Sequence, residues 1–173
     1  MPAIQQRLQA LGLTLPSPLQ PPGGMVLPFP WVRIVGRRVF VSGHGPQLAD
    51  GSLSPLRGKL GRELDIAQGR AAARLTALAV LGSLERALGD LDAIGTWCRV
   101  FGMVASAPGF NRQPDVINGF SELVLDVFGP EVGAHARSAV GMAELPMDIP
   151  VEVEAEIELR ADWSPAGPVT PSS

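Results

Sequence analysis

Residues 151–160 carry the clearest pattern in the chain, a strict alternation of apolar and polar positions. Glu152, Glu154, Glu156 and Glu158 occupy the polar positions. Because successive side chains of a strand point to opposite faces, this pattern predicts a strand with one apolar and one acidic face. The apolar face fits contact with helices. The acidic face must then be covered by water or by another subunit.

Two segments have the three- and four-residue spacing of apolar side chains that predicts helices, residues 65–88 and 115–128. Asp65 followed three residues later by Gln68 is typical of a capping box at the start of the first helix. Gly129 and Pro130 predict the end of the second, because glycine adopts the left-handed cap and proline interrupts the helical hydrogen bonds.

Three further stretches read as strands. Residues 31–43 predict a hairpin that turns at Gly36-Arg37, with glycine at the first central position of a II′ turn. Residues 94–105 are nearly all apolar, which predicts a strand buried on both faces. A last strand is expected over 137–144. With two helices on one face of a mixed sheet, the fold class is α+β, a two-layer sandwich.

The ends of the chain differ from this central part. Residues 3–12 predict a short amphipathic helix, and residues 14–30 hold six prolines, which favour an extended connector. The connector is either a plain linker or, near Phe29 and Trp31, the lining of a pocket. We expect an N-terminal extension over 1–30, one domain over 31–162 and a flexible tail over 163–173.

Composition narrows the function classes. Of 173 residues, 46% are hydrophobic and only 18% are charged, which is enough for one core and suggests that part of the surface is covered by another subunit. The net charge of −3 argues against a nucleic-acid binder. One cysteine, no secretory start and no long apolar run predict a cytoplasmic protein without a membrane span.

Familiar catalytic signatures are missing from the sequence. It has no Walker A motif, no nucleophile elbow, and only two histidines and one cysteine, so zinc-ligand spacing is absent. His44 and His135 are each expected to be structural, and Cys98 to be an inert packing residue. Arg137, at the mouth of a strand, is either a surface arginine or the anchor of a carboxylate through two parallel hydrogen bonds.

Four segments together resemble the reactive intermediate deaminase family (RidA/YjgF-like), part of which is labelled endoribonuclease L-PSP. They are GRRVFVSG at 36–43, ARSAV at 136–140, ELP at 144–146 and VEVEA at 151–155. The resemblance covers about residues 30–160. It implies a chorismate-mutase-like fold and a homotrimer with ligand sites between subunits. The activity it implies is hydrolysis of enamines and imines such as 2-aminoacrylate to 2-oxo acids and ammonia, without a cofactor or metal.

The same resemblance assigns roles to individual residues. Arg137 would hold the substrate carboxylate, and Glu152 would orient or activate the attacking water. Gly43, after Ser42, would place its backbone against the substrate amine, and Asn118 would line the site. Phe29 or Trp31 would fill the space of a tyrosine that the family often has near the N-terminus.

Two departures from the family keep an alternative open. Ala139 stands where a cysteine is frequent, and the chain has no tyrosine. The alternative is therefore a non-catalytic module that binds small carboxylates at a subunit interface. A remote third possibility, ribonuclease action, has only the older family label in its favour, against the acidic charge and the scarcity of histidine.

Overall fold

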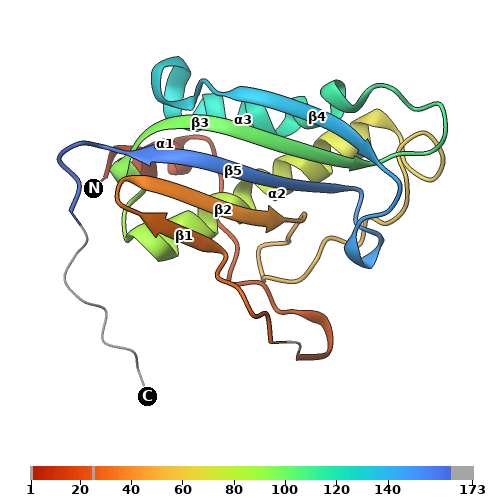
Figure 1. Cartoon of the computed structure of the whole chain (residues 1–173), viewed down its shortest axis with the longest axis horizontal. Coiled ribbons are helices and arrows are strands. Elements are labelled where there is room, and N and C mark those ends of the chain that lie inside the picture. Colours follow the sequence, from red (N-terminus) through yellow and green to blue (C-terminus); the bar gives the residue numbers. More distant parts are fainter. Residues whose placement is uncertain (1, 25, 165–173) are drawn as a thin grey trace.

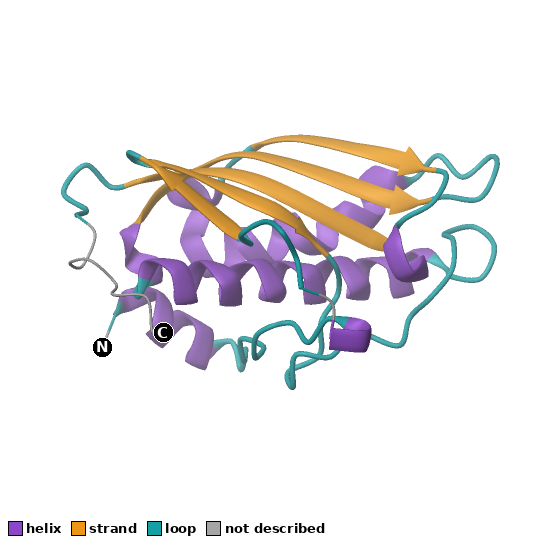
Figure 2. Ribbon diagram, turned by 60° about the horizontal axis from the view of Figure 1, so that its bottom comes forward, coloured by secondary structure: helices purple, strands orange, loops and turns teal. Residues whose placement is uncertain are grey.

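The computed structural model describes residues 2–24 and 26–164 and confirms a two-layer α+β fold (Figure 1). A five-stranded sheet has the order β1-β2-β5-β3-β4, and only β3 and β4 are parallel among the paired strands. Two long helices cover one face of this sheet, and the other face carries no helix (Figure 2). The strands are β1 (Val32–Val35), β2 (Arg38–His44), β3 (Ile94–Ala105), β4 (Ala136–Met142) and β5 (Val151–Leu159).

The helices are α1 (Ala3–Ala10), α2 (Ile66–Leu88) and α3 (Gln113–Gly133), with short 3-10 turns at Pro22–Gly24, Leu91–Ala93 and Pro146–Asp148. The core lies between the sheet and the α2–α3 layer, where Val100, Phe120 and Val153 are completely buried. A Cβ on Gly119 of α3 would collide with the backbone of Arg70 on α2. Glycine at this position therefore allows the two helices to approach closely.

Two local signals of the sequence, the capping box and the hairpin glycine, are confirmed. Both hydrogen bonds of the capping box form, from the Gln68 N–H to the Asp65 carboxylate at 2.8 Å and from the Asp65 N–H to the Gln68 side-chain oxygen at 2.9 Å. The hairpin turns at Gly36, whose φ of +61° is the value that the first central position of the predicted turn requires. Each signal acts within a few residues, so tertiary contacts did not override it.

Three predictions about the elements were wrong. β3 is not buried on both faces, because its side chains alternate and Cys98 is exposed. The register with β5 shifts between Trp97 and Arg99, so Cys98 is the extra residue of a bulge and lies outside the core. The second long helix starts at Gln113 and reaches Gly133 instead of covering 115–128, although Gly129, with φ of +75°, does interrupt it where Gly129 and Pro130 predicted its end. The last predicted strand starts and stops earlier, at Ala136–Met142.

The N-terminal region is docked on this domain. The Asp92 carboxylate accepts hydrogen bonds from the N–H groups of Ala3 and Ile4, at 2.6 and 2.8 Å, and Leu8 of α1 is buried. The connector is tied down by a bond from the Ser17 N–H to the Ala49 carbonyl at 3.0 Å. Of the predicted tail, residues 165–173 lie outside the described part of the chain. Across the described residues, no helix is long and apolar enough to cross a membrane.

Candidate functional site

Arg137 lies on the edge strand β4 and reaches toward α3. It is in register with Val100 of β3, a core residue, so its side chain points to the helix layer. Its Nη1 donates to Asn118 Oδ1 at 2.9 Å and to Ser121 Oγ at 3.1 Å, and its Nη2 donates to the Pro114 carbonyl at 3.5 Å. The structure thus brings together Arg137 and Asn118, two of the residues that the sequence singled out.

Ser121 and His135 complete this group, which we call the arginine cluster (Arg137, Asn118, Ser121 and His135). His135 Nδ1 lies 2.7 Å from the Gly133 carbonyl, which only accepts, so Nδ1 carries the proton. Nε2 is then an acceptor, and the Ser121 hydroxyl donates a hydrogen bond to it at 2.9 Å. The lone pairs of Ser121 Oγ are left for Arg137. Burial lowers the pKa of His135, and the nearby Arg137 cation lowers it further, which favours this neutral form.

One edge of the Arg137 guanidinium remains available. Burial lowers its pKa, but the group stays charged at any physiological pH. Nη1 makes two of the bonds above, and Nη2 makes one long bond. Within residues 2–24 and 26–164, Nε–H has no partner, and Nε and Nη2 lie along the same edge of the guanidinium. This is the geometry that binds a carboxylate through two parallel hydrogen bonds.

Glu152 stands at the start of β5, on the face of the sheet without helices. Its neighbours Val151 and Val153 are buried against the helix layer, so Glu152 points the other way. β2 bulges between Val41 and His44 opposite this strand, and the bulge turns Gly43 toward Glu152. A Cβ on Gly43 would overlap the Glu152 carboxylate, so a larger residue here would displace the Glu152 side chain.

A cavity of about 400 Å³ opens beside Glu152, and we call it the Glu152 cavity. Its lining is otherwise apolar: Leu19, Pro21, Leu27, Phe29, Trp31, Gly43, Gly45, Leu53, Pro146, Met147 and Ile149. Burial raises the pKa of Glu152, and the Glu154 charge raises it further. No hydrogen bond or ion pair joins the Glu152 carboxylate to any residue that the structure describes.

The connector therefore lines a pocket, which decides between the two alternatives left open by the sequence. The Phe29 and Trp31 rings meet edge to face with centroids 5.6 Å apart, and both border the Glu152 cavity. Ser42 does not line the cavity but holds the connector in place. Its hydroxyl donates to the Pro30 carbonyl at 2.9 Å, and its N–H donates to the Trp31 carbonyl at 3.0 Å.

Within one chain, Arg137 and Glu152 are not brought together. Arg137 faces the helix layer and Glu152 faces away from it. β3 lies between their strands, and three residues of register separate Glu152 from Ala155, the β5 position level with Arg137. Strand spacing and rise place their Cα atoms roughly 14 Å apart. A ligand of metabolite size cannot contact both groups of the same chain.

The other histidine, His44, is held in place by hydrogen bonds of its ring. His44 is buried, with Nε2 2.8 Å from Ser83 Oγ and Nδ1 2.6 Å from the Ser42 carbonyl, so it is structural as expected. Burial lowers its pKa to about 4. No group of three or more His, Cys, Asp or Glu suited to a metal occurs among the residues described.

The sequence reasoning missed the parts that support the site. Ser121 follows Asn118 by three residues on α3, and this spacing puts both on one helix face, a signal that would have found it. Met147 and Leu27 line the Glu152 cavity from loops, and nothing in the local sequence marks them. Their approach to Glu152 depends on how the loops fold back on the sheet.

Comparison with known proteins finds several relatives of this chain. Residues 5–155 match the family model described as "YjgF/chorismate_mutase-like, putative endoribonuclease". Protein TCP17 of Trypanosoma cruzi is 42% identical over 157 residues, which cover 91% of this chain and 94% of that protein. The crystal structure of the Agrobacterium tumefaciens protein Atu1372, of unknown function, is 39% identical with a TM-score of 0.80, over 91% of this chain and 94% of that one.

A Shewanella oneidensis protein whose crystal structure carries the same endoribonuclease description is also similar. It is 30% identical with a TM-score of 0.82, and the match covers 91% of this chain and 99% of that one. In all three comparisons the match covers nearly the whole of both chains, so the N-terminal region and the domain are compared together.

Proposed function

Because the chain belongs to the YjgF/chorismate-mutase-like family, we propose that it hydrolyses enamines and imines of 2-oxo acids, releasing ammonia. The observation that carries the proposal is the free Nε–Nη2 edge of Arg137, a fixed and partly desolvated cation that matches a carboxylate. Every imine of a 2-oxo acid carries that carboxylate beside the reacting carbon. The proposal therefore assigns Arg137 to the carboxylate and Glu152 to the water.

The reaction needs only these groups and water. The carbon of the protonated imine is electrophilic. Glu152, whose raised pKa makes its carboxylate a stronger base, accepts a proton from water as the water oxygen bonds to that carbon. The resulting carbinolamine takes that proton from Glu152 on its nitrogen, and its C–N bond breaks to release ammonia. The hydroxyl proton passes to the ammonia as the C=O bond forms. One protonated imine and one water thus give one 2-oxo acid and one ammonium ion.

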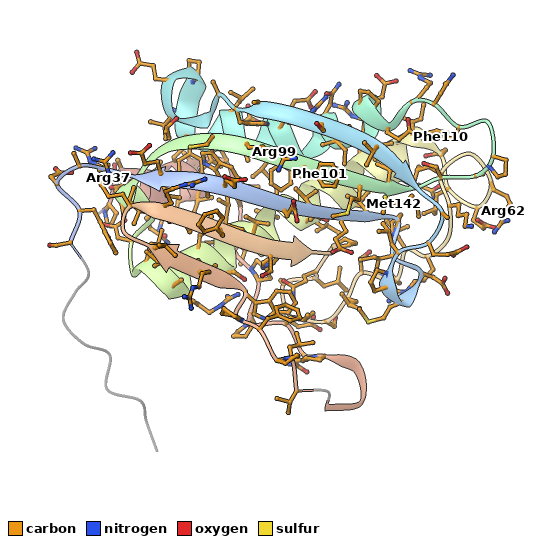
Figure 3. The ribbon with its side chains drawn as sticks, viewed as in Figure 1. Arg37, Arg62, Arg99, Phe101, Phe110 and Met142 are labelled. Carbon is orange, nitrogen blue, oxygen red and sulfur yellow. The ribbon has the colours of Figure 1, made fainter. Side chains whose placement is uncertain are left out.

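The separation of Arg137 from Glu152 leads us to propose a homotrimer whose sites are shared between two subunits. The face of the sheet without helices has the composition of an interface, with Phe40, Arg99 and Phe101 among its exposed or half-exposed residues. Figure 3 shows Arg99 and Phe101 on this face, where the Arg99 guanidinium lies 5.4 Å from the Phe101 ring centre. A second copy would cover this face and bring its own Arg137 toward Glu152.

Mixing two inactive variants tests both parts of the proposal. Arg137→Ala and Glu152→Gln proteins should each lose imine hydrolysis, measured with imines generated in place by an amino-acid oxidase. After unfolding and refolding together in equal amounts, they should recover about a quarter of wild-type activity, because random mixing leaves a quarter of the shared sites intact. An active wild type without any recovery would contradict the shared site, and an inactive wild type would contradict the deaminase.

The second candidate function is a binding module for small carboxylates without catalysis. Ala139 on β4, in the place of the family's frequent cysteine, favours it. In that case 2-oxo acids would stabilise the protein thermally while imine hydrolysis stayed at background. Ribonuclease action is not proposed, since the arginines of the open sheet face pair with glutamates, as Arg38 does with Glu156 at 2.8 Å.

A further inference from the structure

We infer that the acid bound at this site carries a large apolar side chain, which occupies the Glu152 cavity. This inference rests on the proposed function, because it names the substrate class of the same site. A three-carbon acid such as 2-aminoacrylate would leave most of the roughly 400 Å³ beside Glu152 unfilled. An aliphatic or aromatic side chain of an imino acid derived from leucine, methionine or phenylalanine has the size and polarity that this space accepts.

The chemistry of the cavity wall favours an apolar occupant. Two leucines of the connector, Leu19 and Leu27, and Leu53 of a later loop line the cavity together with Phe29 and Trp31. Among the described residues of the lining, Glu152 is the only ionisable one. A polar or charged substrate side chain would lose its water there without gaining partners, whereas an apolar one gains burial.

A strained turn supplies one side of this wall. Met147 and Asp148 both have left-handed backbone conformations, with φ of +57° and +56°, which cost energy for residues other than glycine. The turn is held by bonds from the Gly58 N–H to the Asp148 carbonyl at 3.0 Å and from the Ile149 N–H to the Pro146 carbonyl at 3.2 Å. It places the Met147 side chain, 48% exposed, at the edge of the cavity.

Methionine suits such a position. Its unbranched thioether is flexible and polarisable, and it adapts to apolar groups of different shape. In the single chain Met147 gains little from burial, so the strain of its backbone is not offset by its own packing. A bound apolar side chain would supply the missing contact.

The position of the cavity gives the bound acid one orientation. If the reacting carbon lies against the water of Glu152, the carboxylate points to an arginine and the third substituent enters the space next to Glu152 and Gly43. Each methylene added to that substituent should then raise kcat/KM about fourfold, the effect of burying one such group. The imine from leucine should exceed that from alanine about 50-fold.

The experiment has a rate arm and a binding arm. Imines generated in place from alanine, 2-aminobutyrate, leucine and phenylalanine give kcat/KM. Thermal shifts with pyruvate, 2-oxobutanoate, 4-methyl-2-oxopentanoate and phenylpyruvate give binding without catalysis. Both series should rise with side-chain size. A flat or falling series in both arms would overturn the inference, even if the protein hydrolyses every imine.

Two variants connect the preference to the cavity. Leu27→Trp fills it, so the advantage of leucine over alanine should fall at least tenfold in either arm, while Leu125→Trp on the exposed surface of α3 should change nothing. Met147→Gly removes the strain, so the melting temperature should stay level or rise while the same advantage shrinks. An unchanged preference in both cavity variants would overturn the inference.

The failures of the two proposals are distinguishable. A rising binding series without any hydrolysis would contradict the deaminase and support the apolar pocket. Hydrolysis with a flat series would support the deaminase and contradict the pocket's role. If the protein neither hydrolyses any imine nor binds any of the 2-oxo acids, both proposals are overturned.

Discussion

The arginine cluster and the Glu152 cavity surround their charged groups in opposite ways. In the cluster a cation is held by polar neighbours, Asn118, Ser121 and the Pro114 carbonyl, and every bond restricts where its free edge points. In the cavity a carboxylate stands in an apolar wall without a bond to any described residue, and burial raises its pKa. The first is built for position and the second for reactivity.

This difference depends on the separation of Arg137 from Glu152 in one chain. If Arg137 and Glu152 were adjacent, they would form an ion pair, which would occupy the free edge of Arg137 and lower the pKa of Glu152. Placing them on opposite faces of the sheet, two strands apart, prevents that pairing within one chain. Each keeps its capacity to act on a third group.

The largest effect is expected at the cation. Arg137→Ala should reduce kcat/KM for imine hydrolysis about 10³-fold, because removing one partner of a desolvated charge pair costs about 4 kcal/mol. Arg137→Lys should recover only part of this, since an ammonium cannot make two parallel hydrogen bonds. Steady-state kinetics measure both, with Arg112→Ala on the exposed start of α3 as the control. A lysine variant as active as wild type would show that the fork is not used.

The next effect is expected at the carboxylate. Glu152→Gln should lower kcat about 10²-fold, as for loss of a positioned base, while the melting temperature stays level or rises because a desolvated charge is removed. In wild type the rate should fall as the pH drops through the pKa of Glu152, which lies above its ordinary 4.5.

Glu154→Gln is the matched control for this prediction. Glu154 raises the pKa of Glu152 and is itself exposed. Its replacement should keep the rate at neutral pH and move the acid limb to lower pH. A limb that does not move, or a Glu152→Gln protein with full activity, would contradict the role of Glu152.

A third prediction concerns the pH dependence of stability, which we expect to depend on the buried His44, outside both the arginine cluster and the Glu152 cavity. Its pKa is about 4 in the folded chain against 6.5 unfolded, so the unfolded state binds more protons between these values. The free energy of unfolding should therefore be highest above pH 6.5 and fall by about 3 kcal/mol as the pH drops to 4.5. Urea unfolding at several pH values measures this. His44→Gln should flatten the slope, and a wild type with no slope would contradict the burial of a neutral His44.

The smallest effect is expected at His135, which acts on the substrate only through Ser121 and Arg137. His135→Phe frees the Ser121 hydroxyl and should raise KM about tenfold with kcat little changed, the effect of weakening one bond to a charged group. His135→Gln offers an acceptor again and should recover part of the loss. A fall in kcat alone would contradict a positioning role. RNA cleavage that is lost in His135→Phe would revive the ribonuclease alternative.

Much of the fold was readable because its signals are local. The capping box, the hairpin glycine and the alternation of β5 each depend on residues within one turn or one strand. The bulge at Cys98 was not readable, because it exists only relative to β5, some sixty residues away in sequence. The helical turn that follows Gly129 was also missed, although Gly129 interrupts the helix as its sequence indicates.

The candidate site also has features that the sequence predicts and features that only the tertiary structure sets. By itself the sequence determined which residues have the chemistry, an arginine at a strand mouth and a glutamate in an alternating strand, and which face of its strand Glu152 shares. Only the tertiary structure decided that Arg137 points to the helices, that the connector closes an apolar cavity beside Glu152, and that the two lie on opposite faces. A period of two determines sidedness within a strand, but strand order, bulges and loop docking come from hydrogen bonds and burial between distant segments.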